Sequence, residues 1–477
     1  MRMLAVILLL CPLSAMAQPQ LPPPLAEWLA KGTLPADSVA LVVKEAGSAD
    51  TLVAYNAAKP MNPASVIKVI TTYAGLELLG PAYNWKTEVS MTGELRGSTL
   101  HGDLILHGGG DPKLTVDRLA ALVRRLRDRG LYSLQGDLVL DKGFFDVAPF
   151  DPARFDGEVL RAYNVGADAL LLNFKAVRFQ FAPSLNNRAV TIVPDIPLSQ
   201  LEIVNRVRLT DGNCGELRDR VTLDVQNVSA TQVRVAFSGT YARECGEQNW
   251  NVSLLDHSRF VGGAFAALWK AAGGVWVGAV RIEAAPATAK VITVLESPNL
   301  AEIVRDINKY SNNVMARQLF LTLSAEPGKA GSVERSTSLV RDWLQKKGIA
   351  APELVLENGA GLSRIERVSA ATLAGVLDSA WKSSVMPEFV SSLALVGVDG
   401  TLRKRARGES VAGQAHLKTG TLNDSRCLAG YVLDANGKNW IVVLLVNHAN
   451  PGNVQALQDA LLQWVHRGAP MPHLPPG

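Results

Sequence analysis

A serine and a lysine three positions apart open an apolar helix early in the chain. Residues 61–80 read MNPASVIKVITTYAGLELLG, with Ser65 at the start of the expected helix and Lys68 one turn later. Residues three apart lie on the same face of a helix, so the lysine amine can reach the serine hydroxyl. A serine becomes a nucleophile when a neighbouring base takes its proton. The simpler interpretation is that Asn62 or Ser65 caps the helix and that Lys68 extends to solvent.

Two further short motifs could complete a catalytic set. An S-x-N triplet at residues 311–313 follows helical text that begins at residue 299, and a K-T-G triplet at 418–420 follows a strand expected at about 413–418. Each motif is weak alone, because S-x-x-K occurs by chance about once or twice in a chain of this length. The S-x-N triplet is also common at helix caps. Their order, with each at the boundary of an expected element, indicates one shared site.

The elements that would position these motifs come from both ends of the chain. A hairpin is expected over residues 38–57, directly before the Ser65 helix, and a second over 426–447 around the turn Ala-Asn-Gly. With the strand before the K-T-G triplet, this makes five strands. An amphipathic helix is expected at 453–468. We therefore predict an α/β (α+β) fold in which a five-stranded antiparallel sheet is covered by helices.

The middle of the chain, from about residue 87 to 284, is dominated by short alternating strands and turns. HGDLILHGGGDP is echoed 34 residues later by QGDLVLDKGFFD, which suggests two related hairpins. The alternating text VTLDVQNVSATQVRVAFSGTY suggests a nested β-rich subdomain. We expect a catalytic domain that is split by an insertion, with these boundaries: catalytic domain 18–86 and 285–477, inserted domain 87–163 and 251–284, nested subdomain 164–250.

The first residues predict export. MRMLAVILLLCPLSAMAQ combines a positive charge, an apolar run of about ten residues and a small-x-small ending, so we predict a signal peptide over residues 1–17. Cys11 does not make a lipoprotein site, because the three leucines before it lack the small residue that processing needs. No later run approaches the ~18 residues of a membrane span. We expect a periplasmic protein without a transmembrane anchor after signal removal.

Charge and cysteine usage narrow the partners further. The formal net charge is +4 and no basic stripe carries interleaved aromatic residues, so nucleic acid is not an expected partner. In an oxidising compartment Cys214 and Cys245 are expected to form a disulfide, which leaves Cys427 as a buried small hydrophobe. The seven histidines show no metal-ligand spacing, so we expect no metal and no cofactor.

The three motifs, in the order S-x-x-K, S-x-N and K-T-G, resemble those of the serine penicillin-recognising acyl transferases. The chain most resembles the low-molecular-mass class C penicillin-binding proteins, the D-alanyl-D-alanine carboxypeptidase/endopeptidase family. The resemblance extends to GGGDPKLT, ENGAGLSRIERVS and VGVDGTLRKR, and to the insertion of about 240 residues between the first two motifs. It implies a transpeptidase/β-lactamase-like fold. It also implies an enzyme that hydrolyses peptidoglycan stem peptides and cross-links. It also implies acylation by β-lactam antibiotics.

The resemblance assigns roles to the motif residues. Ser65 attacks the scissile carbonyl and Lys68 takes its proton, provided that burial and a neighbouring cation lower the lysine pKa. Ser311 relays the proton to the leaving amine, and Asn313 binds the substrate amide and holds Lys68. Lys418, expected at a strand end facing solvent, supplies that cation and binds the substrate carboxylate.

Further residues are expected to hold the substrate. Thr419 assists Lys418, Gly420 leaves room for the peptide along the strand, and the N–H groups of Ser65 and Thr421 form the oxyanion hole. The segment RFDGEVLRAYNVGA matches the part of the family that faces the diamino acid of the stem peptide. It adds three candidates for substrate binding: Asp156, Glu158 and Tyr163.

Two alternatives are compatible with parts of this pattern. A β-lactamase or esterase of the same fold shares S-x-x-K and K-T-G, but a typical β-lactamase is too short to contain the insertion. A non-catalytic peptidoglycan-binding protein could descend from such an enzyme. Loss of activity usually begins with the nucleophile or its base, and both are present here. The enzyme interpretation is therefore preferred.

Overall fold

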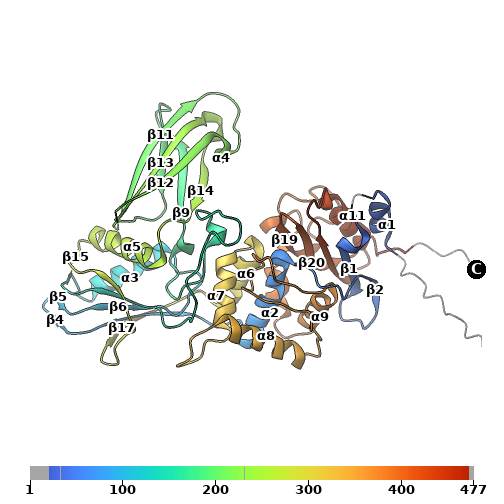
Figure 1. Cartoon of the computed structure of the whole chain (residues 1–477), viewed down its shortest axis with the longest axis horizontal. Helices are drawn as coiled ribbons and strands as arrows, with labels where there is room; N and C mark the ends of the chain where they lie inside the picture. Colours follow the sequence, from blue (N-terminus) through green and yellow to red (C-terminus); the bar gives the residue numbers. More distant parts are fainter. Residues whose placement is uncertain (1–20, 33, 230, 472–477) are drawn as a thin grey trace, which may run out of the picture.

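The computed structural model describes residues 21–471, except residues 33 and 230. The signal peptide predicted at residues 1–17 lies outside this range. The described chain forms a lobe of helices around a large sheet, a second lobe of smaller sheets, and a β-rich part that projects from the second lobe (Figure 1). In this part of the chain no helix is both long and apolar enough to cross a membrane.

A six-stranded antiparallel sheet organises the first lobe. The two predicted hairpins form as expected, and both ends of the chain contribute. The sixth strand is a two-residue edge that pairs with only two residues of its neighbour, which is too short for a sequence pattern. In spatial order the strands are β18 (Ala394–Leu395), β19 (Ala415–Leu422), β20 (Ser425–Leu433), β21 (Asn439–Asn447), β1 (Val39–Glu45) and β2 (Thr51–Tyr55).

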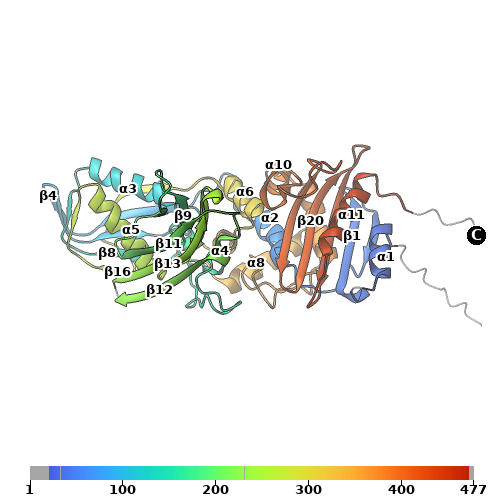
Figure 2. The same ribbon diagram turned by 90° about the horizontal axis from the view of Figure 1, so that it is seen from above.

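Helices cover both faces of this sheet (Figure 2). Alternate residues of β1 point to opposite sides: Val39, Leu41 and Val43 join the core under the two terminal helices, whereas Ala40 and Val42 join the other core. Because both faces are buried, β21 reads as the continuous apolar run IVVLLV. The terminal helices are α1 (Pro23–Ala30) and α11 (Val454–His466); the opposite face carries α2 (Lys68–Leu78), α6 (Leu300–Tyr310), α7 (Asn313–Thr322), α8 (Val333–Lys346), α9 (Ala370–Trp381) and α10 (Met386–Ser392).

Two smaller sheets and two helices build the second lobe. The echoed segments are not hairpins, which corrects the prediction. Each is a strand that bends at a glycine from one sheet into the other, and the two lie side by side in parallel with a third such strand. A Cβ at Gly136 would lie 2.3 Å from the carbonyl oxygen of Gly102, so the bends must pack without side chains.

The strand orders of the two sheets follow from this arrangement. The first sheet is β15 (Val275–Trp276), β7 (Ser133–Leu134), β5 (Thr99–His101) and β4 (Glu94–Arg96). The second sheet is β16 (Val280–Ile282), β8 (Leu138–Asp141), β6 (Leu104–His107), β3 (Lys86–Met91) and β17 (Lys290–Glu296). The β-rich reading of this region missed two amphipathic helices, α3 (Val116–Asp128) and α5 (His257–Ala271). They pack against each other and contribute apolar side chains to the lobe's core.

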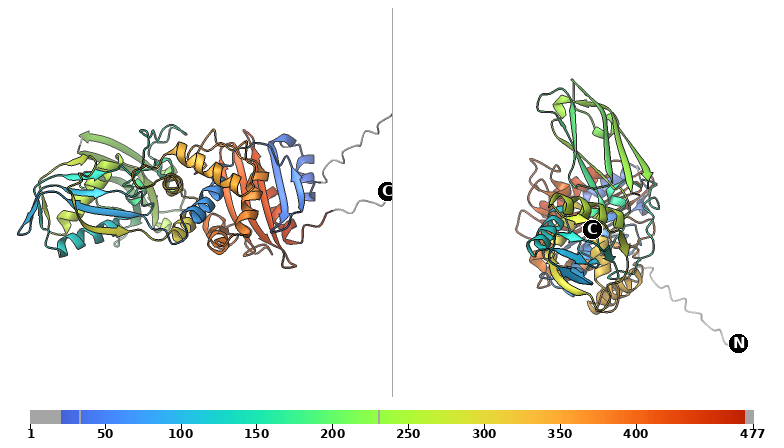
Figure 3. Two further views of the ribbon diagram at one scale, coloured as in Figure 1. Left: turned by 90° about the horizontal axis from the view of Figure 1, so that it is seen from below. Right: turned by 90° about the vertical axis from the view of Figure 1, so that its left-hand side faces the viewer.

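The projecting part consists of two three-stranded sheets (Figure 3). A disulfide joins Cys214 to Cys245 there, with a Cα–Cα distance of 4.8 Å. Cys427 is buried, and burial raises the pKa of its thiol to about 12. The sheets contain β10 (Val190–Pro194), β9 (Val177–Pro183) and β14 (Gln248–Val252), then β11 (Leu201–Thr210), β13 (Gln232–Ala242) and β12 (Val221–Ser229), with the short helix α4 (Leu217–Arg220) before β12.

Candidate active site

The turn that carries Ser65 is held from two sides. Asn447 donates to the carbonyl of Asn62 (2.9 Å) and accepts from its N–H (2.6 Å), while the Asn62 amide donates to the carbonyl of Ser363 (2.9 Å). Ala64 adopts φ 46°, a left-handed conformation that an alanine rarely takes. The Asn62 side chain stabilises it by accepting from the Ala64 N–H (2.9 Å). A single 3-10 turn, Ala64–Ile67, then leads into α2.

The helix-cap interpretation of Ser65 does not describe what the side chain does. Neither the 3-10 turn nor α2 has a side-chain cap. Lys68 does not extend to solvent either, since its side chain is fully buried. Its Nζ lies 2.9 Å from Ser65 Oγ and donates to Asn313 Oδ1 (2.8 Å) and to the carbonyl oxygen of Ala360.

This geometry suits a base. The Ala360 carbonyl and the Asn313 amide oxygen can only accept hydrogen bonds, so they occupy two N–H groups of the lysine. In a neutral amine the remaining direction is the lone pair, and it faces the Ser65 hydroxyl. Burial lowers the Lys68 pKa well below its usual value, and the charges of Lys418 and Arg317 lower it further. The pKa shift therefore favours the neutral form that can take a proton.

The S-x-N triplet forms the break between two helices. Ser311 ends α6 in a left-handed conformation (φ 55°), and Asn312 caps α7 by accepting from the N–H of Met315 (3.1 Å). Asn313 is thus the first residue of α7, and its Oδ1 faces Lys68. Its Nδ2 donates to the carbonyl of Tyr163 (3.2 Å), which brings the inserted segment to the site.

The position of Lys418 differs from the expectation. The strand β19 continues to Leu422, so the K-T-G triplet lies inside the strand and not at its end. The lysine is fully buried and does not face solvent, because its Nζ donates to Ser311 Oγ (2.8 Å) and to the carbonyl of Thr419 (2.9 Å). Burial lowers its pKa to about 7. Each lysine of the site is therefore paired with one serine.

Gly420 is required by the backbone around Ser65. A Cβ at this position would lie 2.6 Å from the carbonyl oxygen of Pro63 and 3.1 Å from the Ser65 nitrogen. The glycine thus lets the Ser65 turn pack directly on β19. Beyond Leu417, no strand of the described residues pairs with β19 on its β18 side, and Thr421 is exposed there. The unpaired edge can receive an extended peptide.

The three candidates from the inserted segment behave differently. The Tyr163 hydroxyl donates to Asp156 Oδ2 (2.8 Å), and the Tyr163 carbonyl binds Asn313, so these two residues lie beside the catalytic set. Glu158 is exposed and pairs with Arg161 (3.2 Å). Its side chain makes no hydrogen bond to the catalytic set among the described residues.

Sequence reasoning missed several groups around Lys68. The sequence could not single out the Ala360 carbonyl, because every residue has a backbone carbonyl oxygen. Arg317 and Glu366 are buried and ionisable, and both act on the Lys68 pKa. Burial raises the pKa of Glu366 itself, while the backbone N–H groups of Asn358, Glu357 and Gly359 and the charge of Lys68 oppose that rise. Glu366 lies in the segment ENGAGLSRIERVS, which carries part of the family resemblance, and the sequence of this segment does not indicate that the glutamate is buried. Among residues 21–471, apart from 33 and 230, no cluster of three potential metal ligands was found.

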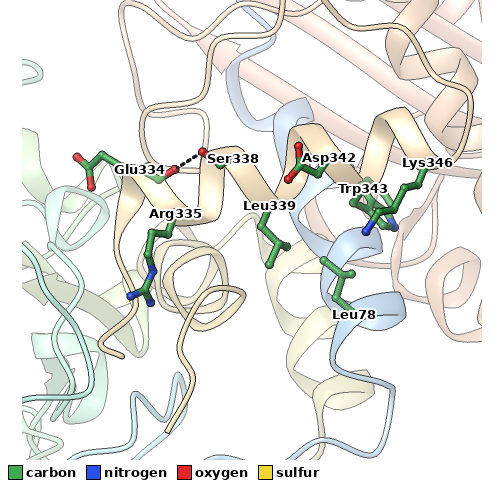
Figure 4. Close-up of a pocket in the computed structure, with 8 residues that line it drawn as sticks. All are labelled: Leu78, Glu334, Arg335, Ser338, Leu339, Asp342, Trp343 and Lys346. Carbon is green, nitrogen blue, oxygen red and sulfur yellow. Dashed lines mark hydrogen bonds between the residues drawn. The ribbon is translucent and has the colours of Figure 1, made fainter. Parts of the chain in front are cut away.

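A separate hollow of about 490 Å³ lies on the outside of the first lobe, between α8 and the end of α2 (Figure 4). Charged residues of both signs, among them Glu334 and Lys346, surround Leu78, Leu339 and Trp343. None of the motif residues lines this hollow, and we assign it no part in the chemistry.

Comparisons with known proteins show which proteins the chain is similar to. The chain is 26% identical to a D-alanyl-D-alanine carboxypeptidase of Actinomadura sp. (strain R39), over 88% of this chain and 80% of the relative. It is 24% identical to the D-alanyl-D-alanine carboxypeptidase DacB of Haemophilus influenzae, over 88% and 87% of the two chains. In fold it is similar to the crystal structure of penicillin-binding protein 4 from Haemophilus influenzae, with a TM-score of 0.74, 22% identity and coverage of 90% and 96%.

A more distant likeness in fold is to a penicillin G acylated endopeptidase of Bdellovibrio bacteriovorus. The TM-score is 0.51 at 17% identity, with 90% of this chain and 91% of the other covered. The family described as D-Ala-D-Ala carboxypeptidase 3 (S13) matches residues 22–467, which is nearly the whole described chain. The chain therefore belongs to the D-Ala-D-Ala carboxypeptidase 3 (S13) family of serine peptidases.

Proposed function

We propose that Ser65 is the acylated nucleophile and Lys68 its base in a D-alanyl-D-alanine carboxypeptidase. The observation that carries the proposal is the environment of Lys68 Nζ, which has two acceptor-only partners and Ser65 Oγ at 2.9 Å. Ser65 Oγ forms a bond to the scissile carbonyl carbon as its proton moves to Lys68. The C–N bond of the terminal D-alanine then breaks, and water hydrolyses the acyl-enzyme.

Ser311 and Lys418 would act on the other side of the scissile bond. Ser311 Oγ, held by Lys418, is placed to pass a proton to the leaving amine. Lys418 in its charged form, with Thr419, would receive the terminal carboxylate of the substrate. A carboxylate in this buried position would favour the protonated lysine, because opposite charges attract more strongly away from water.

The substrate would lie along the free edge of β19. The N–H groups of Ser65 and Thr421 would bind the oxyanion, and Gly420 keeps the Ser65 turn close to the strand. Asp156 and Tyr163 would face the stem-peptide side chain, since the Tyr163 backbone binds Asn313. Glu158 would contribute at most to the negative charge of the surface around Asp156 and Tyr163.

The family and the sequence support further proposals about the substrates, the location and the domain division. We propose peptidoglycan stem peptides and cross-links as substrates, so that carboxypeptidase and endopeptidase activity share one acyl-enzyme, and β-lactam antibiotics as acylating ligands. We propose a periplasmic location after removal of residues 1–17. We also propose the division into a catalytic domain (18–86 and 285–477), an inserted domain (87–163 and 251–284) and a nested subdomain (164–250). The separate sheets support this division except at residue 285, because β17 (Lys290–Glu296) pairs with β3 and so belongs to the sheet of the inserted domain.

Release of D-alanine from a pentapeptide ending in D-Ala-D-Ala tests the proposal. We expect the wild-type protein to release D-alanine and Ser65→Ala to release none above background. Ser369→Ala is the matched control, because Ser369 caps α9 through the N–H of Thr372 (3.0 Å) and lies outside the catalytic set. Equal release by the Ser65→Ala protein would contradict the assignment.

A further inference from the structure

We propose that Glu366 is a positioning residue for the base, acting through the turn at residues 357–361. The inference rests on the proposed role of Lys68. The Glu366 carboxylate is buried and contacts neither Ser65 nor the free edge of β19. Its proposed role is to fix the direction in which the Lys68 amine points.

The turn is wrapped around the Glu366 carboxylate. The side chain is fully buried, and Oε1 accepts from three consecutive backbone N–H groups, those of Glu357 (3.1 Å), Asn358 (2.9 Å) and Gly359 (3.0 Å). Asn358 tightens the same turn, since its Oδ1 accepts from the N–H of Ala360 (2.9 Å). A carboxylate that accepts several backbone N–H bonds fixes a loop strongly, because charge-assisted bonds in a buried site are strong.

The held turn presents two carbonyl groups to α2. The Gly359 carbonyl accepts from Thr71 Oγ1 (2.7 Å), and the Ala360 carbonyl accepts from Lys68 Nζ. These two side chains lie one helical turn apart on the same face. The next residue, Gly361, has φ 83°, and a Cβ there would lie 2.0 Å from the Ala64 carbonyl oxygen. The turn is therefore packed against both the base and the backbone before the nucleophile.

Charge gives Glu366 a second effect on the base. Lys418 from β19 and Arg317 from α7 face Lys68 as cations, and Glu366 is the carboxylate that opposes them. Its charge raises the Lys68 pKa, against the lowering by burial and by the two cations. The other carboxylate of the turn, Glu357, is paired with Arg154 (2.8 Å) at the surface. Loss of the Glu366 charge should thus lower the Lys68 pKa further.

The assay is the rate of acylation by a fluorescent penicillin, measured across a pH series. Two substitutions of Glu366 separate the effect of its position from the effect of its charge. Glu366→Gln keeps the shape but loses the charge, so we expect the maximal rate to fall about tenfold or more and the acidic limb to move to lower pH. Glu366→Asp keeps the charge but withdraws the carboxylate by one methylene group. We expect a loss of similar size with the acidic limb near its wild-type position.

Glu353→Gln is the matched control. Glu353 is also a carboxylate that holds a backbone N–H, that of Ser369 (3.0 Å), but it does not contribute to the Lys68 pKa. We expect its rate and pH profile to match the wild type. A folded Glu366→Gln protein with a wild-type rate, or with a reduced rate and an unmoved acidic limb, would overturn the proposal. If Glu366→Gln does not fold, a wild-type rate in Glu366→Asp overturns it.

Failure of the positioning role of Glu366 can be distinguished from failure of the proposed function. A Lys68→Ala protein that is acylated at the wild-type rate would contradict the base assignment itself, whatever the Glu366 variants do. If Lys68→Ala is inactive and the Glu366 variants behave like the wild type, only the positioning role fails.

Discussion

Lys418→Met should make the protein more stable while it abolishes acylation. Lys418 is fully buried, and burial lowers its pKa from 10.5 to about 7. That shift corresponds to roughly 5 kcal/mol against the charged form in the folded state. Methionine has a similar length and no charge. The substitution removes the two hydrogen bonds that the Lys418 amine donates to Ser311 and Thr419, worth about 1 kcal/mol each. We therefore expect a net gain of about 2–3 kcal/mol below pH 7.

The dependence on pH follows from where the proton binds. The unfolded chain holds the Lys418 proton up to about pH 10.5, whereas the folded chain releases it above about pH 7. The folded state therefore loses stability as the pH falls from 10.5 to 7, and the whole cost is present below 7. The advantage of Lys418→Met should be largest at pH 6 and should shrink progressively at pH 8 and pH 9.

Thermal unfolding followed by circular dichroism at pH 6, 8 and 9 provides the assay. Lys309→Met is the matched control, because Lys309 is also nearly buried but is paired with Asp399 at 2.7 Å. Removing that lysine leaves a carboxylate without its partner, so we expect a loss of stability. The reasoning is refuted if Lys418→Met is no more stable than the wild type at pH 6, or if its gain does not change with pH.

Three further predictions concern the base, the strand and the disulfide. Lys68→Arg should abolish penicillin labelling, because a guanidinium stays protonated near neutral pH; retained labelling would make the lysine structural only. Gly420→Ala should slow acylation about 100-fold, because its Cβ would lie 2.6 Å from the Pro63 carbonyl oxygen. Gly375→Ala, with 3.5 Å to the nearest atom, should acylate normally. Cys214→Ser should destabilise the projecting part by about 3–4 kcal/mol in urea unfolding and leave acylation unchanged. A variant as stable as the wild type would show that the disulfide does not stabilise this part.

Local patterns in the sequence were sufficient for much of the fold. The two hairpins and the C-terminal helix follow from apolar periodicity and one Ala-Asn-Gly turn, and these depend only on neighbours along the chain. Likewise, the spacing of Ser65 and Lys68 already placed them on one helical face. The parallel arrangement of the echoed segments was missed, since pairing between strands 34 residues apart depends on the helix that connects them.

The site was harder to predict wherever it depends on long-range packing. Lys418 was expected to face solvent because the sequence does not show that the break between α6 and α7 places Ser311 over it. The Ala360 carbonyl is invisible for a similar reason, as any residue can present a backbone oxygen. Glu366 resembles a surface residue in sequence, and its burial follows from the three N–H groups that surround it.

The central claim is that Ser65 is the residue that becomes acylated. The most direct measurement is mass spectrometry of the protein after reaction with penicillin, followed by mapping of the modified peptide. We predict one adduct per chain, on the peptide that contains Ser65, and no adduct in Ser65→Ala. An adduct on a different serine, or undiminished labelling of Ser65→Ala, would contradict the account.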